Sequence, residues 1–346
     1  MPISEVAVEN FTAFDELSLN FSKGINVFIG DNGTGKTHLL KFLYAFCESK
    51  RIENGGALKD VFFALLYDFF DMKDNYFWIR HPKKKYAFEA KLFDGSVCCI
   101  KGDCSSDSAA YNQMAENLDS AMIHHENIND LNKFKSAFIP AKEMLTHSRI
   151  EKDYAHRKLP LDRTLIDIIN NASISSLRHI PDDSREMMTE IEKIIGGSVT
   201  YKNDTYYILR GGSKYNFRVE AEGHKKFALL SRLIEGGVLR KGSMLFWDEP
   251  ESNINPKNVP KLVDILLALQ TAGVQVFLAT HDYLLPKYLE LRRKETDDVQ
   301  FHLFSRASFK KPVTVSSDTA FSAFENNYII NQPIELYKET IKRGMD

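Results

Sequence analysis

The chain has 346 residues, 43% of them hydrophobic, and carries 45 basic against 47 acidic side chains. That length and apolar content suffice for one large or two modest folded domains with a real core. The near balance of charge gives no reason to expect nucleic acid or a membrane as a partner, although a local basic patch stays open. The first residues lack the basic start and apolar core of a signal peptide, and no run of 18 apolar residues occurs, so we expect a cytoplasmic protein without a membrane partner.

Three strands are expected near the start of the chain. Residues 3–8 have a strand-like pattern, residues 17–21 alternate apolar and polar side chains, and residues 25–29 form an apolar run. The third strand leads into a glycine-rich loop and then into a helix expected over residues 38–46. The order is therefore strand, glycine loop, helix.

The glycine-rich loop has the spacing of a P-loop: Gly30, four residues, then Gly35, Lys36 and Thr37. In such a loop the glycines let backbone N–H groups curl around a phosphate at a helix N-terminus. We expect Lys36 to reach the β- and γ-phosphates of ATP and Thr37 to hold Mg²⁺. The predicted cofactor-binding residues here are Gly30, Asp31, Asn32, Gly33, Thr34, Gly35, Lys36, Thr37 and His38.

The middle of the chain, residues 50–195, is expected to be an insert that divides the nucleotide-binding core into residues 1–49 and 196–346. It opens with a helix over residues 57–71 and continues with an antiparallel hairpin, residues 85–100, whose turn is Asp94-Gly95. A lysine run at residues 83–85 precedes the hairpin and could meet a phosphate backbone or form a solvated face.

The insert is expected to end in a helical lobe. A short buried strand at residues 136–140 leads into it, and residues 150–195 have helical spacing broken at Pro160 and Pro181. Short strands are then expected within residues 198–219.

Two further apolar strands are followed by side chains that are expected to bind metal or take part in catalysis. The strand at residues 243–247 is followed by Asp248 and Glu249, the Walker B arrangement, in which Asp248 would bind Mg²⁺ and Glu249 would polarise the attacking water. The strand at residues 274–279 is followed by Thr280 and His281. Because ligands lie beyond the carboxyl ends of parallel strands, we expect the P-loop, both carboxylates and His281 at one sheet edge. The predicted catalytic residues are Lys36, Glu249 and His281.

The ordered set of segments 30–37, 221–226, 247–256 and 280–281 resembles the ABC-type ATPase heads of the RecF, SMC and OLD group. The resemblance implies an α/β P-loop NTPase fold, a head with a mixed β-sheet core and an inserted antiparallel and helical lobe. It also implies a head-to-tail homodimer that encloses two ATP molecules, in which Gly223 meets the γ-phosphate held by the other subunit and His281 senses it.

The chain departs from this family at several places, two of which bear on the predicted site residues. Ala221 or Glu222 stands where the signature serine is usual, and no glutamine follows the strand at residues 138–140, where relatives have a Mg²⁺-contacting one. We assign Glu143 as the substitute metal ligand, beside Thr37 and Asp248.

Three functions remain open. The first is an OLD-like or Septu-like ATPase of a bacterial antiphage defence system, which controls a separate effector such as a nuclease or toxin. The second is a RecF-like repair ATPase that clamps duplex DNA, which the even charge balance disfavours mildly. The third, a transporter ATPase subunit, is disfavoured by the long insert and the incomplete signature. Residues 282–346 are too few for a separate catalytic domain, so we expect the effector to be a second polypeptide.

Overall fold

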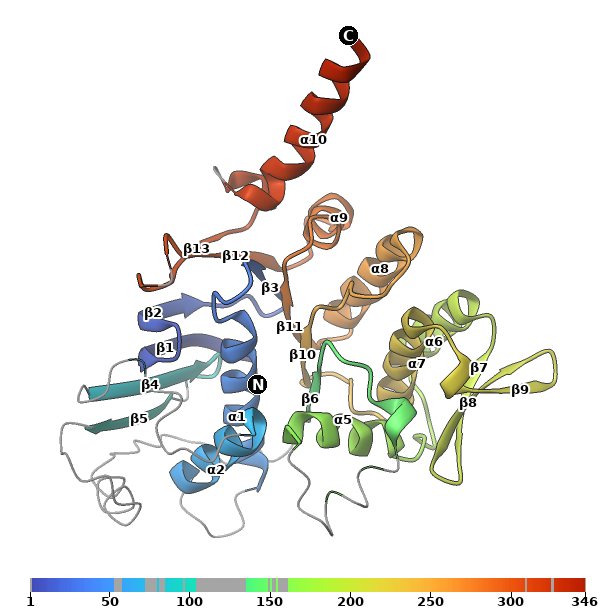
Figure 1. Cartoon of the computed structure of the whole chain (residues 1–346). Helices are drawn as coiled ribbons and strands as arrows, with labels where there is room; N and C mark the ends of the chain where they lie inside the picture. Colours follow the sequence, from blue (N-terminus) through green and yellow to red (C-terminus); the bar gives the residue numbers. More distant parts are fainter. Residues whose placement is uncertain are drawn as a thin grey trace.

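The computed structural model describes residues 2–52, 58–71, 80, 85–95, 97–103, 135–148, 150, 154, 161–308, 310–324 and 327–345. Its strands form one six-stranded, one four-stranded and one three-stranded sheet, and helices lie between and around them (Figure 1). The three strands expected near the start are β1 (Ile3–Phe11), β2 (Phe14–Asn20) and β3 (Ile25–Gly30).

The six-stranded sheet is mixed, with the strand order β13-β12-β3-β11-β10-β6. All neighbours are parallel except β13, which pairs antiparallel with β12 at the edge. Its remaining strands are β6 (Ser136–Ile139), β10 (Met244–Asp248), β11 (Gln275–Thr280), β12 (Val299–Ser305) and β13 (Thr314–Asp318). The central strands β3 and β11 are buried along their whole length because both faces of this sheet are covered.

Alternate side chains of β10 enter two different cores. Leu245 and Trp247 pack in a core formed with α5 (Arg163–Ser173), α6 (Asp182–Ile195), α7 (Glu222–Glu235) and α8 (Val259–Thr271). Met244 and Phe246 point to the other face, where they pack with α1 (Lys36–Ile52) and α2 (Leu58–Phe70). The period of two along a strand thus divides the interior into two layers.

The hairpin that we expected as an inserted flap belongs to the core. Strands β4 (Lys85–Leu92) and β5 (Val97–Asp103) continue the sheet of the first two strands in the order β2-β1-β4-β5. Val6 pairs with Ala90 across this junction, and Tyr86 and Phe88 are buried in the same core as α1. The alternating apolar face of β4 requires that cover, so a free flap would expose it. Strand β6 likewise belongs to the six-stranded sheet, although it too falls within the expected insert.

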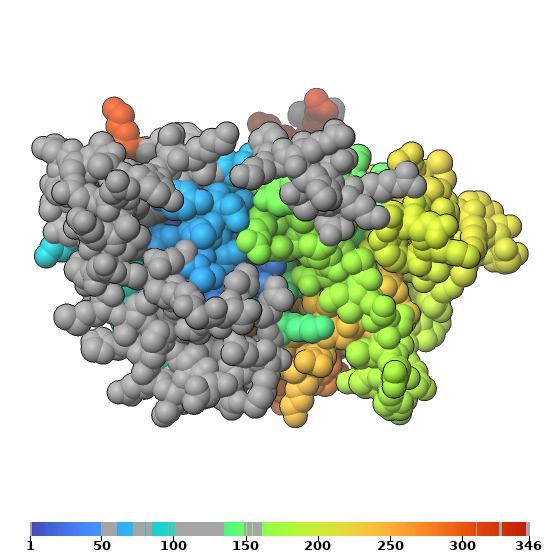
Figure 2. All heavy atoms as spheres, turned by 90° about the horizontal axis from the view of Figure 1, so that it is seen from below, coloured from blue at the N-terminus to red at the C-terminus, as the bar shows by residue number. Residues whose placement is uncertain are grey.

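The helical lobe is found where it was expected. Helix α6 begins after Pro181, as predicted, whereas Pro160 lies outside the described residues. Arg163 of α5 pairs with Asp68 of α2 at 3.2 Å, and Figure 2 shows these two helices side by side on one face. A three-stranded antiparallel sheet completes the lobe: β7 (Ser198–Lys202), β8 (Thr205–Arg210) and β9 (Ser213–Asn216).

Two helices follow the last parallel strands. Helix α9 (Leu284–Arg292) packs beside α8, and α10 (Tyr328–Met345) leaves the body of the molecule (Figure 1). Short 3-10 turns lie at Leu145–His147 (η2), Phe217–Val219 (η3), Pro256–Asn258 (η4) and Phe321–Ala323 (η5). In the part of the chain that the structure describes, no helix has both the length and the apolar character needed to span a membrane.

Candidate nucleotide-binding site

The P-loop connects β3 to α1 through backbone conformations that favour glycine. Gly30 has φ 153° and Gly35 has φ 87°. A Cβ atom on Gly30 would lie 2.3 Å from the Phe304 carbonyl oxygen, and one on Gly35 would lie 2.8 Å from the Phe14 ring. Both positions therefore lack room for a side chain, and the loop can curl closely enough to present its N–H groups to an anion.

Lys36 lies inside the loop that it follows. Its Nζ donates to the carbonyl oxygens of Gly30 and Asp31, each at 2.7 Å, and its side chain is buried. Burial lowers the pKa of Lys36, while the neighbouring carboxylates of Asp248 and Glu249 oppose that change. The ammonium group is thus held against the glycine loop by two backbone carbonyl oxygens.

Thr37 and Asp248 meet across the end of the sheet, as predicted. The Thr37 hydroxyl lies 3.0 Å from both carboxylate oxygens of Asp248. Burial raises the pKa of Asp248, and the hydrogen bond from Thr37 partly offsets it. Hydroxyl and carboxylate oxygens are the donors that Mg²⁺ prefers, and the cradle beside them fits a phosphate, so these residues suit a Mg²⁺–nucleotide pair.

Glu249 and His281 also come together. Oε1 of Glu249 lies 3.0 Å from Nδ1 of His281, and both side chains are partly exposed at the sheet edge. The backbone of Glu249 is left-handed, with φ 47°, an uncommon conformation for a residue with a side chain. Its N–H donates to the Ala279 carbonyl at 2.8 Å, and its carbonyl accepts from Lys226 Nζ at 2.8 Å. These two bonds hold the strained residue in place.

Two charged groups that support this edge were not among the residues predicted from the sequence. Lys226 of α7 also donates to the Ser252 hydroxyl at 2.6 Å, and burial lowers the pKa of Lys226 to about 8. Glu251 accepts from the Thr280 hydroxyl at 2.6 Å, and burial raises the pKa of Glu251 to about 7. Their sequence signals were weak: Lys226 lies at the end of the signature-like segment, and Glu251 is simply the next acidic residue after Glu249.

Gly223 lies in the first turn of α7, and its position has a packing reason within one chain. A Cβ atom there would lie 2.9 Å from the carbonyl oxygen of Asn253, in the loop that follows Walker B. The absence of a side chain lets α7 approach that loop. Its predicted contact with a phosphate of a second subunit stays a prediction.

Glu143, predicted as a metal ligand, and His38, predicted as a nucleotide-binding residue, contact protein side chains instead. Glu143 accepts from the Thr146 hydroxyl at 2.5 Å and from the Thr146 N–H at 3.1 Å, and its carboxylate lies 3.9 Å from Lys225 Nζ. These contacts place Glu143 at the turn before η2 and beside α7, and they do not support its predicted role as a metal ligand. The His38 ring lies edge-on to Phe70, with ring centres 5.1 Å apart.

A cavity of about 410 Å³ opens beside the P-loop. Asp31, Asn32 and Gly33 line one side of it, and His281 and Tyr328, the first residue of α10, line another. Burial raises the pKa of the Tyr328 hydroxyl, and so does its hydrogen bond to Asp31. The start of α10 therefore contacts the nucleotide loop directly.

Comparisons with known proteins agree with this geometry. A family model described as "AAA ATPase domain" matches residues 1–231. The DNA replication and repair protein RecF of Cytophaga hutchinsonii is 48% identical over 50 residues, which are 14% of this chain and 13% of that protein. The DNA double-strand break repair Rad50 ATPase of Pyrococcus abyssi is 44% identical over 63 residues, 18% of this chain and 7% of that protein. The chain thus matches only a small share of the length of these relatives.

A solved structure of an Smc head bound to the C-winged helix domain of ScpA is similar over most of both chains. The TM-score is 0.57 at 12% identity, and the match covers 93% of this chain and 99% of that chain. At this identity the likeness concerns the fold alone. Together with the family model it confirms the predicted fold class and the prediction of a P-loop ATPase.

Proposed function

Because the chain belongs to the AAA ATPase domain family, we propose that it binds ATP with Mg²⁺ and hydrolyses the ATP between two copies arranged head to tail. The observation that carries this proposal is the meeting of Thr37 with Asp248 and of Glu249 with His281 at one sheet edge. The first of these contacts joins residues that lie 211 positions apart in the chain.

Each residue of the edge has a role that its position permits. The P-loop N–H groups and Lys36 bind the phosphates, and Thr37 with Asp248 would hold Mg²⁺, which supplies charge stabilisation when bound. Glu249 orients a water and accepts its proton, since its partly exposed carboxylate lies at the mouth of the site. His281 keeps that carboxylate in position and faces the cavity beside the P-loop.

The proposed dimer rests on the start of α7. Ala221 and Glu222 are exposed there, so the start of the helix lies at the surface of the chain. A helix N-terminus attracts an anion, and a second copy could present its bound γ-phosphate to it. Multi-angle light scattering of Glu249→Gln with ATP and Mg²⁺ tests this arrangement. We expect a larger mass with ATP than with ADP; the same mass with both nucleotides would contradict the sandwich.

We further propose that the ATP cycle controls a separate effector in a bacterial antiphage defence system. The resemblance of the motif set to that of OLD-like and Septu-like ATPases supports this proposal. In addition, the acidic residues Asp248 and Glu249 are already assigned to ATP, so they are not available for a second catalytic site. Purified protein incubated with plasmid, single-stranded DNA, RNA and transfer RNA is expected to leave all four intact. In cells, phage protection by the gene and its neighbour should disappear with Lys36→Ala, whereas protection that persists would contradict ATP control.

A second candidate is an ATP-dependent clamp on duplex DNA, which the similarity to RecF and Rad50 proteins favours. Of the lysine run at residues 83–85, only Lys85 lies within the described residues, and it is exposed. Fluorescence anisotropy with a labelled duplex, with and without ATP, distinguishes the two candidates. Binding that requires ATP and weakens steeply with salt would favour the clamp.

A further inference from the structure

Helix α10 carries an apolar stripe that nothing in the described part of the chain covers. Every residue from 331 to 343 is exposed, and Figure 1 shows the helix extending away from the body. Ile334, Tyr337 and Ile341 are spaced i, i+3 and i+7 and therefore share one face of the helix. Their exposed fractions are 47%, 67% and 40%. A stripe of large apolar side chains over two turns is typical of an interaction surface.

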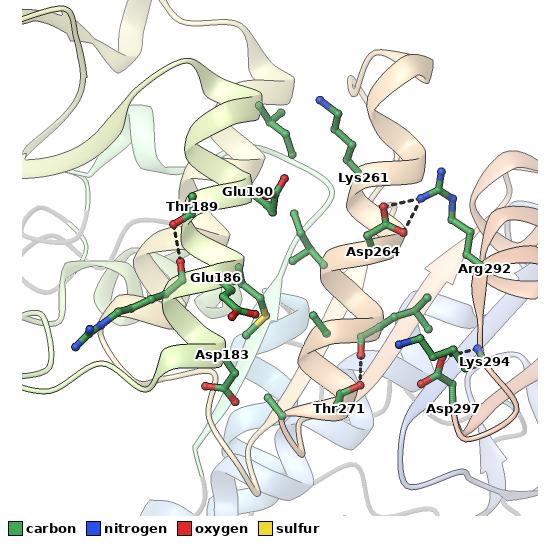
Figure 3. Close-up of a pocket in the computed structure, with 17 residues that line it drawn as sticks. Asp183, Glu186, Thr189, Glu190, Lys261, Asp264, Thr271, Arg292, Lys294 and Asp297 are labelled. Atoms are coloured by element: carbon green, nitrogen blue, oxygen red, sulfur yellow. Dashed lines mark hydrogen bonds and ion pairs between the residues drawn. The ribbon is translucent and has the colours of Figure 1, made fainter.

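A groove of about 850 Å³ lies between α6 and α8, and it has an apolar floor against which such a stripe can pack. Met187 and Ile194 of α6 and Ile265 and Ala268 of α8 contribute apolar surface to it. Figure 3 shows this groove, with charged side chains along both of its walls. An apolar floor between two charged rims suits an amphipathic helix.

The two walls differ in charge. On α6 the exposed carboxylates of Asp183, Glu186 and Glu190 form an acidic wall (Figure 3). On the opposite wall the carboxylate of Asp264 is already paired with Arg292, with N–O distances of 2.6 and 2.5 Å. A helix that enters the groove is therefore expected to place basic side chains toward α6.

Helix α10 has basic side chains at the matching spacing. Lys338 and Lys342 are exposed, lie one helical turn apart and flank the apolar stripe on the same side. Glu186 and Glu190 are also one turn apart, so both pairs are separated by about 6 Å along their helices. In the single chain Lys338 pairs with Glu335, and Glu190 pairs with Lys193. Both are exposed ion pairs within one helix, which contribute little to stability and can be replaced by other pairs.

We propose that α10 of one copy packs in the α6–α8 groove of a second copy, with Lys338 and Lys342 opposite Glu186 and Glu190. A second copy is favoured as the source because α10 points away from the body of its own molecule (Figure 1). The contact joins two different surfaces, so repeating it gives a ring or an open chain of copies. It uses no residue of the proposed ATP sandwich, and it forms without nucleotide.

Sedimentation velocity of the full chain over a concentration series, without nucleotide and at low salt, tests the proposal. We expect self-association in the wild type and at least about tenfold weaker association in Glu186→Lys/Glu190→Lys and in Lys338→Glu/Lys342→Glu, because attraction becomes repulsion. The variant that combines all four substitutions should recover to within about threefold of the wild type. Glu9→Lys/Glu16→Lys, on exposed positions of β1 and β2, makes the same charge change elsewhere and should associate normally.

Ile334→Asp/Tyr337→Asp provides a second route that does not depend on the salt bridges. Both positions are exposed, so the body should fold, which circular dichroism verifies, and association should be lost. The proposal is overturned by a wild type that stays monomeric at about 100 µM, by a combined charge variant that does not recover, or by association that survives the aspartate substitutions. A monomer whose α10 is nevertheless protected from proteolysis would place the helix in its own groove and would also overturn it.

Discussion

The six-stranded sheet and the three-stranded sheet of the lobe differ in burial and in what they position. In the first, β3 and β11 are buried along their whole length, and the P-loop, Glu249 and His281 follow its strand ends. In the second, β9 is largely exposed, and its neighbour β8 supplies Arg210, which donates to the Ile195 carbonyl at 2.9 and 2.6 Å and pairs with Glu220 at 2.7 Å. Since Glu220 lies two residues before α7, the lobe positions the helix start that the proposed second copy would meet. The six-stranded sheet thus carries the residues of the nucleotide site, and the three-stranded sheet supports the start of α7.

Lys36→Ala is expected to have the largest effect of the substitutions, and it acts on ATP binding at the site that the six-stranded sheet positions. The substitution removes the cation at the mouth of the loop, and charge-assisted contacts to phosphate are the strong ones. We expect no measurable ATP binding by calorimetry with Mg²⁺, and an unchanged melting temperature without nucleotide. Binding like that of the wild type would refute the P-loop assignment.

Glu249→Gln should leave ATP binding nearly intact and slow hydrolysis by about 10³-fold, in the range of a lost general base. The amide keeps the size of the side chain but cannot accept the proton. Phosphate release under saturating ATP measures the rate, and Asp94→Asn, in the β4–β5 turn, serves as a distant carboxylate control. Unchanged turnover would mean that another carboxylate is the general base, and Glu251 would be the next one to test.

His281→Ala is expected to slow hydrolysis on the order of 10²-fold, as when one polar group at a reacting centre is lost. ADP affinity should be retained, because the predicted role of His281 concerns the γ-phosphate, which ADP lacks, and its ion pair is with Glu249. Parallel calorimetry with ADP and ATP gives the decisive comparison. Equal loss of both affinities would mean that His281 has a structural role at the strand end.

Ile208→Ala probes the lobe. Ile208 of β8 is fully buried, so its truncation should cost about 2–5 kcal/mol of unfolding free energy. ADP binding should not change, because the nucleotide loop is built on the other sheet. Urea denaturation with and without ADP measures both effects, and a parallel loss of ADP affinity would show that the two sheets are not independent in function.

The contrast between the sheets also explains what the sequence could predict. The P-loop and Walker B segments are local patterns at the ends of apolar runs, so their residues and strands followed from spacing. The pairing of Val6 with Ala90 joins distant segments. Because the alternation of each strand fits several partners, the sequence predicts the hairpin but not the strand that it joins. Glu143 was assigned from its place after a strand, but Thr146, three residues further on, provides a local partner for its carboxylate. The bond from Lys226 to Glu249 exists only once α7 packs against the Walker B loop.

Glu251→Gln should give the smallest effect, and the effect should depend on pH. Burial raises the pKa of Glu251 from 4.5 to about 7, so between these values the folded chain holds a proton that the unfolded chain has released. Stability therefore falls as pH rises through this window in the wild type, and the full cost is present above pH 7. The neutral amide can still accept the hydrogen bond from Thr280, and it has no such cost. Urea denaturation in chelator, without nucleotide, should show a stability advantage of the Gln variant that is absent near pH 4.5 and grows toward pH 7, whereas Glu295→Gln, at an exposed position, should track the wild type. An advantage that does not change with pH would mean that Glu251 is ionised in the folded chain, with the nearby ammonium of Lys226 as its counter-charge.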